Sequence, residues 1–317
     1  MRHASMLGVV LALFLCEAPC SHVSAQVRRE YSEVHMGMPV RIVLHASDDD
    51  AARAAARAGF ARIAELDAMM SDYRPDSELR RLATHNGAWT KISPELFDVL
   101  ARALEIARAS EGAFDPTVAP LVALWREARR NGTMPPTNSL DSARALVSWR
   151  LVHLDTTARA IRLDRAGMRL DLGGIAKGYI LQAAAETMRA VKTGSFMVEA
   201  GGDLVVGDPP PGQDGWVIEV PGADSTLSRL ASALANAALS TSGPTMQLVE
   251  IAGVRYSHVV DPRTGLGLTS LSITYVLAAH GATSDGMATA LGVMGPLGVS
   301  VLKNRLPFAF TASVAQR

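Results

Sequence analysis

Residues 171–178 read DLGGIAKG, and this stretch marks a strand-to-helix junction in the middle of the chain. We predict a strand over residues 167–172, followed by two glycines and a helix over residues 174–191. Glycines let a backbone approach a ligand closely, and a helix N-terminus offers free amides and partial positive charge to phosphate. Lys177 in the first turn would add a full charge. An ordinary strand-to-helix turn explains the same residues equally well, and neither the Walker loop nor the dinucleotide fingerprint is present.

Helices and strands are mixed irregularly on both sides of this junction. Helices are expected over residues 48–70, 78–83, 93–110, 174–191 and 284–294. Strands are expected over residues 33–44, between residues 151 and 172, and from 196 to 275. Gly37 and Pro39 interrupt the first strand, where a bend or bulge is expected. Mixing without strict strand–helix alternation predicts an α+β fold, and no linker divides residues 26–317, which we interpret as one domain.

The charge balance excludes some partners. Lys plus Arg equals Asp plus Glu, at 31 each, in a chain of 317 residues. A neutral chain has no general attraction for nucleic acid, so no nucleic-acid partner is expected. An anionic ligand would have to be held by a local site.

The first 25 residues have the pattern of a secretory signal peptide. The apolar run from Met6 to Leu15 is too short to span a bilayer, and small residues end the segment at Ala25. Lipidation at Cys16 or Cys20 is the alternative processing. Both cysteines of the chain lie here, so the mature protein would have no disulfide and no cysteine-ligated zinc. The sequence predicts export.

Residues 283–289, TSDGMAT, carry a second candidate site. Asp285 and Thr289 are four residues apart, so a helix places them on one face. A carboxylate beside a hydroxyl offers the hard oxygen ligands that magnesium or calcium prefers. The alternative is a helix cap followed by a threonine that bonds to its own helix backbone.

Three further segments contain residues suited to chemistry. His258 lies on a strand before an Asp-Pro-x-x-Gly turn, and histidine is suited to accept a proton near neutral pH. The loops 73–77 and 112–117 each pair an aromatic residue with an acid, which could bind a planar ring system. Structural histidine and simple turn chemistry are the alternatives.

Together these segments resemble the ApbE family, the FAD:protein FMN transferases. The matching stretches are residues 36–37, 71–77, 112–121, 171–179, 199–203, 240–243, 258–265 and 284–295. The resemblance implies a two-lobed α+β fold with antiparallel sheets and packed helices, and an FAD cleft between the lobes. It also implies magnesium-dependent transfer of FMN from FAD to a threonine or serine of a partner protein, with AMP leaving.

The resemblance also assigns roles to individual residues. The residues expected to bind FAD are Met36, Tyr73, Ala113, Phe114, Asp115, Asp171, Lys177 and Val260. The magnesium ligands would be the Gly174 carbonyl, Asp285 and Thr289, and His258 near the diphosphate is the expected catalytic base.

The family also suggests the setting and the alternatives. The implied partner is an acceptor protein carrying a flavinylation motif, a membrane electron-transfer subunit, and the implied location is the periplasm, near the inner membrane. Two alternatives use the same residues: a magnesium-dependent FAD pyrophosphatase that gives FMN and AMP, and a non-catalytic periplasmic flavin-binding protein.

Overall fold

The computed structural model describes residues 26–85, 87–243, 248–270 and 272–315. The predicted signal peptide, residues 1–25, lies outside the described residues. The helices are α1 Asp49–Met70, α2 Glu78–Arg81, α3 Pro94–Ala109, α4 Ala119–Asn131, α5 Thr137–Arg144, α6 Ala176–Ala190, α7 Ser225–Ala231, α8 Gly281–Met294 and α9 Gly298–Arg305, with the short 3-10 helices η1 Leu82–Thr84 and η2 Trp149–Leu151. The strands are β1 Val27–His35, β2 Met38–Ala46, β3 Thr90–Lys91, β4 Val152–Asp155, β5 Ala160–Leu163, β6 Phe196–Ala200, β7 Asp203–Val206, β8 Ala237–Ser242, β9 Leu248–Ile251, β10 Val254–Ser257, β11 Ile273–Ala278 and β12 Phe310–Ala315.

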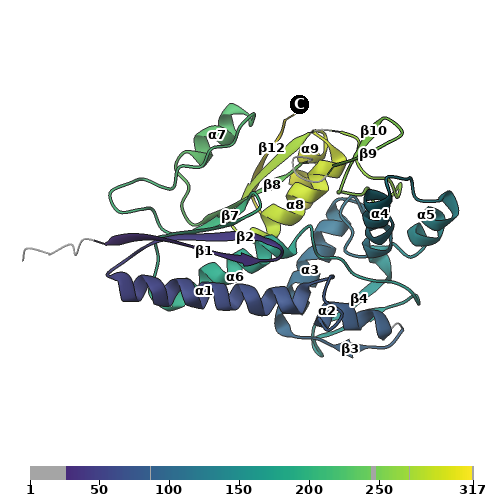
Figure 1. Ribbon diagram of the computed structural model, residues 1–317, viewed down its shortest axis with the longest axis horizontal. Coiled ribbons are helices and arrows are strands. Elements are labelled where there is room, and N and C mark those ends of the chain that lie inside the picture. The colour runs from purple at the N-terminus through teal and green to yellow at the C-terminus, as the bar shows by residue number, and fades with distance from the viewer. Residues whose placement is uncertain (1–25, 86, 244–247, 271, 316–317) are drawn as a thin grey trace, which may run out of the picture.

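A seven-stranded sheet forms the centre of the fold (Figure 1). Its order is β1-β2-β6-β7-β8-β11-β12, and each neighbouring pair is antiparallel. Smaller sheets are formed by β3-β5-β4 and by the β9–β10 hairpin. The predicted α+β class with antiparallel sheets and packed helices is therefore confirmed. Within the described ranges no helix is both long enough and apolar enough to cross a bilayer.

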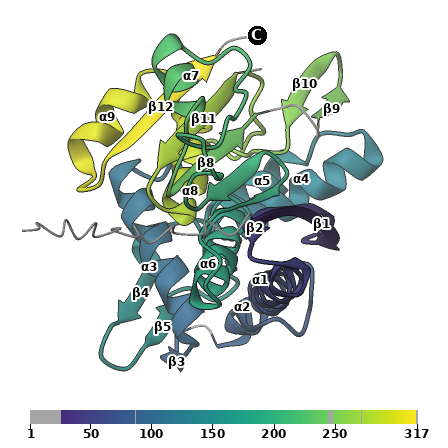
Figure 2. The same cartoon turned by 90° about the vertical axis from the view of Figure 1, so that its left-hand side faces the viewer.

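Both faces of the large sheet are covered. In β2, Val40, Ile42 and Leu44 point into the main core with α1, α3, α6 and α8, whereas Val43 points into a second core with α7. Alternate strand residues face opposite sides of a sheet, so this pattern is what a two-sided sheet requires. Figure 2 shows α1 and α6 side by side beneath the sheet, in agreement with their direct contact.

A third apolar cluster holds α4, α5 and the β9–β10 hairpin together. It is formed by Leu121, Trp125, Ala128, Ala143, Ile251 and Val260. In Figure 2 the hairpin lies next to α4, although the two are more than a hundred residues apart in sequence. This cluster positions the segment after β10, in which His258 follows the end of the strand and precedes the 261–265 turn.

Three local predictions were wrong in detail. The strand expected over 33–44 is a hairpin, because Met36 and Gly37 both have positive φ, 53° and 72°, as a two-residue type I′ turn needs. Residues 167–172 form no strand; the Asp171 amide donates to the Pro116 carbonyl instead of a sheet neighbour, at 2.8 Å. The helix expected from Ser284 begins at Gly281.

Candidate functional site

The start of α6 and the start of α8 meet at two glycines. A Cβ added to Gly178 would lie 2.1 Å from the Gly281 carbonyl oxygen, and one added to Gly281 would lie 2.1 Å from the Gly178 carbonyl oxygen. No larger residue fits at this crossing without displacing backbone. The two candidate segments of the sequence, DLGGIAKG and TSDGMAT, are thereby held against each other.

A compact charge cluster lies at this crossing. Lys177 Nζ contacts the Asp203 carboxylate and lies 3.7 Å from Asp285 Oδ1. The Gly178 amide donates to Asp285 Oδ2 at 3.0 Å, and the Thr241 amide donates to Asp203 Oδ1 at 3.1 Å. Two buried carboxylates thus share one ammonium group, which leaves the cluster with an excess negative charge when both are ionised.

The electrostatics of the cluster follow from this imbalance. Burial, together with the nearby Asp203 charge, raises the pKa of Asp285 to about 7, although Lys177 opposes the shift. The two carboxylates raise the pKa of Lys177 above its ordinary value in spite of burial. A cation at Asp285 would relieve the excess negative charge.

The predicted metal ligands lie together. Thr289 Oγ1 donates to the Gly174 carbonyl oxygen at 3.2 Å, and Asp285 is one turn earlier on the same face of α8. A Cβ on Gly174 would lie 2.9 Å from Thr289 Oγ1, so only glycine brings its carbonyl this close. Carbonyl, hydroxyl and carboxylate oxygens suit magnesium. Among the described residues no group of three or more His, Cys, Asp or Glu could hold a metal, so a magnesium ion here would rely on this mixed oxygen set.

The Asp171 loop is tied to helix α4. Asp171 Oδ1 accepts from the Gly173 amide at 2.7 Å, and Asp171 Oδ2 lies 3.5 Å from Arg126 Nη2. Burial and the neighbouring Asp72 raise the pKa of Asp171. The Arg126 side chain on α4 therefore helps to fix the conformation of the Asp171 loop.

In the 113–117 loop, Asp115 stabilises the loop itself, whereas Ala113 and Phe114 are candidate binding residues. Asp115 accepts from the Thr117 amide at 2.8 Å and from the Trp149 amide at 2.9 Å, so both of its oxygens are used within the protein. Ala113 and Phe114 are buried, and the Phe114 ring lies 3.3 Å from where a Gly174 Cβ would be. The loop thus packs directly behind the proposed metal ligand.

The turn that follows His258 is anchored to α4. Trp125 Nε1 donates to the Gly265 carbonyl oxygen at 2.8 Å, and the Trp125 ring packs 5.0 Å from the Tyr256 ring. Val260 is buried in the same cluster, whereas His258 is exposed. His258 therefore lies at the surface, immediately before the anchored turn.

Met36 and Tyr73 lie near the C-terminal end of α1. The Met36 amide donates to Asp67 Oδ2 at 3.0 Å, which fixes the β1–β2 turn on α1. Tyr73 has 76% of its surface exposed, and the Arg126 guanidinium lies 4.2 Å from its ring centroid. An exposed aromatic ring held by a cation is suited to stack on a planar ligand.

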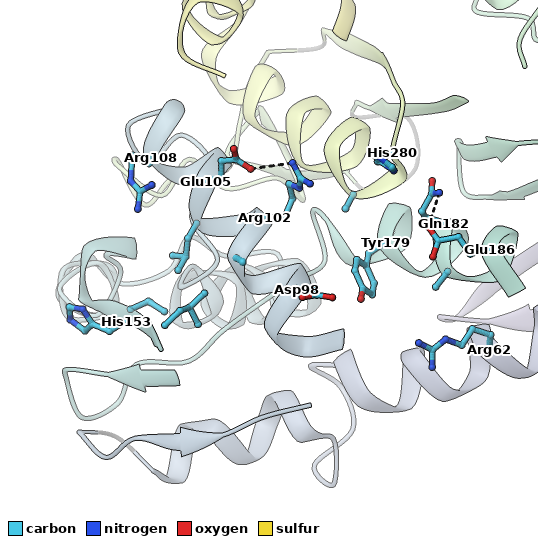
Figure 3. Close-up of a pocket in the computed structure, with 16 residues that line it drawn as sticks. Arg62, Asp98, Arg102, Glu105, Arg108, His153, Tyr179, Gln182, Glu186 and His280 are labelled. Carbon is cyan, nitrogen blue, oxygen red and sulfur yellow. Dashed lines mark hydrogen bonds and ion pairs between the residues drawn. The ribbon is translucent and has the colours of Figure 1, made fainter. Parts of the chain in front are cut away.

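A groove of about 880 Å³ lies beside the α6–α8 crossing (Figure 3). It is lined by residues of α1, α3, α6, β4 and the start of α8, and none of the predicted site residues lines it. Arg102 pairs with Glu105 at 3.2 Å, and Arg62 pairs with Glu95 at 2.8 Å. Since none of the predicted site residues lines the groove, it is not part of the candidate site.

Two residues of the site were missed by the sequence analysis. Asp203 completes the Lys177–Asp285 cluster, and Arg126 connects the 71–77 loop with the Asp171 loop. The sequence does contain a signal that could have identified Asp203, because this residue follows two glycines at the start of an apolar strand. No sequence signal distinguishes Arg126, because it lies in a helix with two other arginines, Arg129 and Arg130.

Comparisons with known proteins identify the family of the chain. The sequence profile of the ApbE family matches residues 36–310. The chain is 34% identical to the FAD:protein FMN transferase of Vibrio cholerae over 73% of this chain and 70% of that protein. It is 29% identical to the protein of the same name from Treponema pallidum over 90% of this chain and 84% of that protein.

Solved structures show the same fold. The ApbE protein of Thermotoga maritima superposes with a TM-score of 0.79 at 26% identity, covering 92% of this chain and 97% of the other. The flavin transferase ApbE of Vibrio cholerae superposes with a TM-score of 0.77 at 26% identity, with the same coverage.

Proposed function

The chain belongs to the ApbE family, and from that premise we propose that it transfers FMN from FAD to a threonine or serine hydroxyl of an acceptor protein, with magnesium and with release of AMP. Its curated relatives are FAD:protein FMN transferases, and the chain is an enzyme of this class. The observation that supports the finer proposal most is the α6–α8 crossing, which joins Lys177, Asp285, Thr289 and the Gly174 carbonyl.

The proposed reaction breaks the phosphoanhydride bond of FAD and forms a phosphate ester bond to the acceptor. The acceptor hydroxyl forms a P–O bond to the FMN phosphorus, the diphosphate P–O bond to AMP breaks, and the hydroxyl proton passes to a base. His258 is our candidate for that base, because it is exposed immediately before a turn that Trp125 and Val260 fix against α4.

The oxygen set at the crossing would hold magnesium. Gly174, Asp285 and Thr289 are the residues that would bind it, and the bound ion would neutralise diphosphate charge and stabilise the leaving phosphate. Lys177 would keep the Asp285 carboxylate in place and add positive charge beside the nucleotide. The remaining contribution of the protein is positioning.

The other predicted contacts complete the proposal. Met36 and Tyr73 would contact the flavin, and Asp171 with Lys177 would hold the nucleotide. Ala113, Phe114, Asp115 and Val260 would line the FAD site, with Asp115 acting by shaping the loop rather than by direct bonding. An FAD cleft between two lobes remains part of this proposal.

The cellular setting is also proposed. The pattern of residues 1–25 supports export to the periplasm, near the inner membrane. The acceptor would be a membrane electron-transfer subunit with a flavinylation motif.

Product analysis tests the proposed reaction. The mature protein would be incubated with FAD, magnesium and a flavinylation-motif acceptor, and the acceptor would be weighed while AMP and FMN are separated by chromatography. A mass gain of one FMN with equimolar AMP is expected. Free FMN and AMP with an unmodified acceptor would identify a pyrophosphatase instead, and no AMP under any condition would identify a binding protein.

A further inference from the structure

Arg126 on α4 contacts three groups from two loops that are distant in sequence. Its Nη1 donates to Asp72 Oδ2, and its Nη2 lies 3.5 Å from Asp171 Oδ2. Its guanidinium carbon lies 4.2 Å from the ring centroid of Tyr73. One side chain therefore connects the 71–77 loop to the 171–174 loop.

The geometry uses properties that only arginine has. A planar guanidinium can stack on an aromatic face while its edge nitrogens pair with carboxylates, whereas an ammonium group can do only one of these well. The side chains of Arg126, Asp72 and Asp171 are 24%, 14% and 9% exposed, so solvent screens this network little. Arg126 Nε is buried and has no hydrogen-bond partner in the described part of the chain. Burying this group costs free energy, which the ion pairs of the guanidinium with Asp72 and Asp171 must offset.

The backbone that carries Arg126 is itself fixed. Leu121, Trp125 and Ala128 are buried at helical spacing on the opposite side of α4, and Trp125 also bonds to Gly265. The guanidinium is therefore held in place by the same helix that fixes the His258 turn. A shift of α4 would move both loops together.

We propose that Arg126 is a positioning residue for FAD, which sets Tyr73 and Asp171 at the spacing that the bound dinucleotide needs. The inference rests on the proposed function, because Tyr73 and Asp171 are the predicted flavin and nucleotide contacts. Arg126 acts through these two residues and not on the reacting phosphorus. Its loss should therefore weaken FAD binding and leave the chemical step nearly intact.

The test compares Arg126→Met and Arg126→Lys with Arg130→Met, an exposed arginine on the same helix that serves as control. FAD affinity is measured by flavin fluorescence, and KM for FAD and kcat are measured by acceptor flavinylation. Arg126→Met should raise the Kd and KM for FAD about tenfold and change kcat less than threefold. Arg126→Lys should recover part of the affinity, because it keeps the charge but not the stacking, and Arg130→Met should match the wild type.

A double variant separates positioning from general damage. Asp72 joins Arg126 to the loop that carries Tyr73, so adding Asp72→Asn to Arg126→Met should raise KM no further than Arg126→Met alone. Thermal melting of each variant reports folding, and a folded Arg126→Met protein with unchanged Kd and KM would overturn the proposal. A fall of about tenfold in kcat with no change in the KM for FAD would also overturn the proposal.

Failure of the proposed function would be visible separately. A wild type that binds FAD but modifies no acceptor contradicts FMN transfer, while a tenfold weaker Kd in Arg126→Met still supports the positioning role. A wild type that binds no FAD overturns both.

Discussion

At the scale of single residues, two glycines set how closely α6 and α8 approach each other. Gly178 and Gly281 bring α6 and α8 so close that the Gly178 amide reaches Asp285 and Lys177 reaches the same carboxylate. The sequence indicated glycine-rich segments but not that they touch, because contact between residues more than a hundred positions apart depends on the whole sheet. The importance of Asp203 was hidden for the same reason.

A Gly178→Ala variant tests this close approach. The added Cβ would lie 2.1 Å from the Gly281 carbonyl oxygen, so the helices must separate, and we expect a loss of about 2 kcal/mol in the free energy of unfolding. Gly292→Ala is the matched control in α8, where the nearest atom would be 3.4 Å away and helix propensity favours alanine. Urea unfolding measures both, and equal stability of the two variants would contradict the contact.

A Lys177→Met variant tests the charge cluster. Removal of the ammonium group leaves Asp203 and Asp285 buried without a cation, so the free energy of unfolding should fall by about 3 kcal/mol in the absence of ligand. Lys91→Met, at an exposed lysine, is the control. If Asp203→Asn is then added, the combined loss should be smaller than the sum of the single losses. Additive losses would show that the two side chains do not interact.

At the scale of elements, α4 organises the site although it carries no predicted catalytic residue. Its buried side holds the β9–β10 hairpin and the turn after His258, and Arg126 holds the two loops on its other side. Helix positions were predicted well where caps were explicit, as at Asp48 and Ser93, whose side chains accept from Ala51 and Leu96 amides. The strand predicted over 167–172 failed because alternating buried leucines occur in a loop that bonds to Pro116 rather than to a sheet.

A Trp125→Phe variant tests the anchoring of the His258 turn. The change removes the hydrogen bond to Gly265 and keeps most of the apolar contact, so the free energy of unfolding should fall by about 1 kcal/mol. The flavinylation rate should fall more than this global loss explains, because His258 lies immediately before the loosened turn. Trp89→Phe, at a half-exposed tryptophan, is the control. A rate equal to that of the wild type would show that the turn needs no such anchor.

At the scale of the whole molecule, the seven-stranded sheet and its two helix-covered faces place distant segments around one crossing. The fold class could be predicted from the mixture of helices and strands, and the candidate site from motif resemblance. The order of strands could not, because β6 pairs with β2 across about 150 residues and local patterns carry no information about partners. The spatial link between Tyr73 and Asp171 likewise depends on α4, which no motif marks.

We propose that the two glycine-rich segments form one magnesium-dependent FMN transfer site. The most direct measurement is the rate at which the acceptor gains the mass of FMN, followed over a magnesium titration for the wild type and for Asp285→Asn. The wild type should show saturable dependence on magnesium and lose transfer on chelation. Asp285→Asn should be slower by about a hundredfold or more, because one ligand of the ion and its charge are lost. An Asp285→Asn protein with the wild-type rate and the wild-type magnesium response would contradict the account.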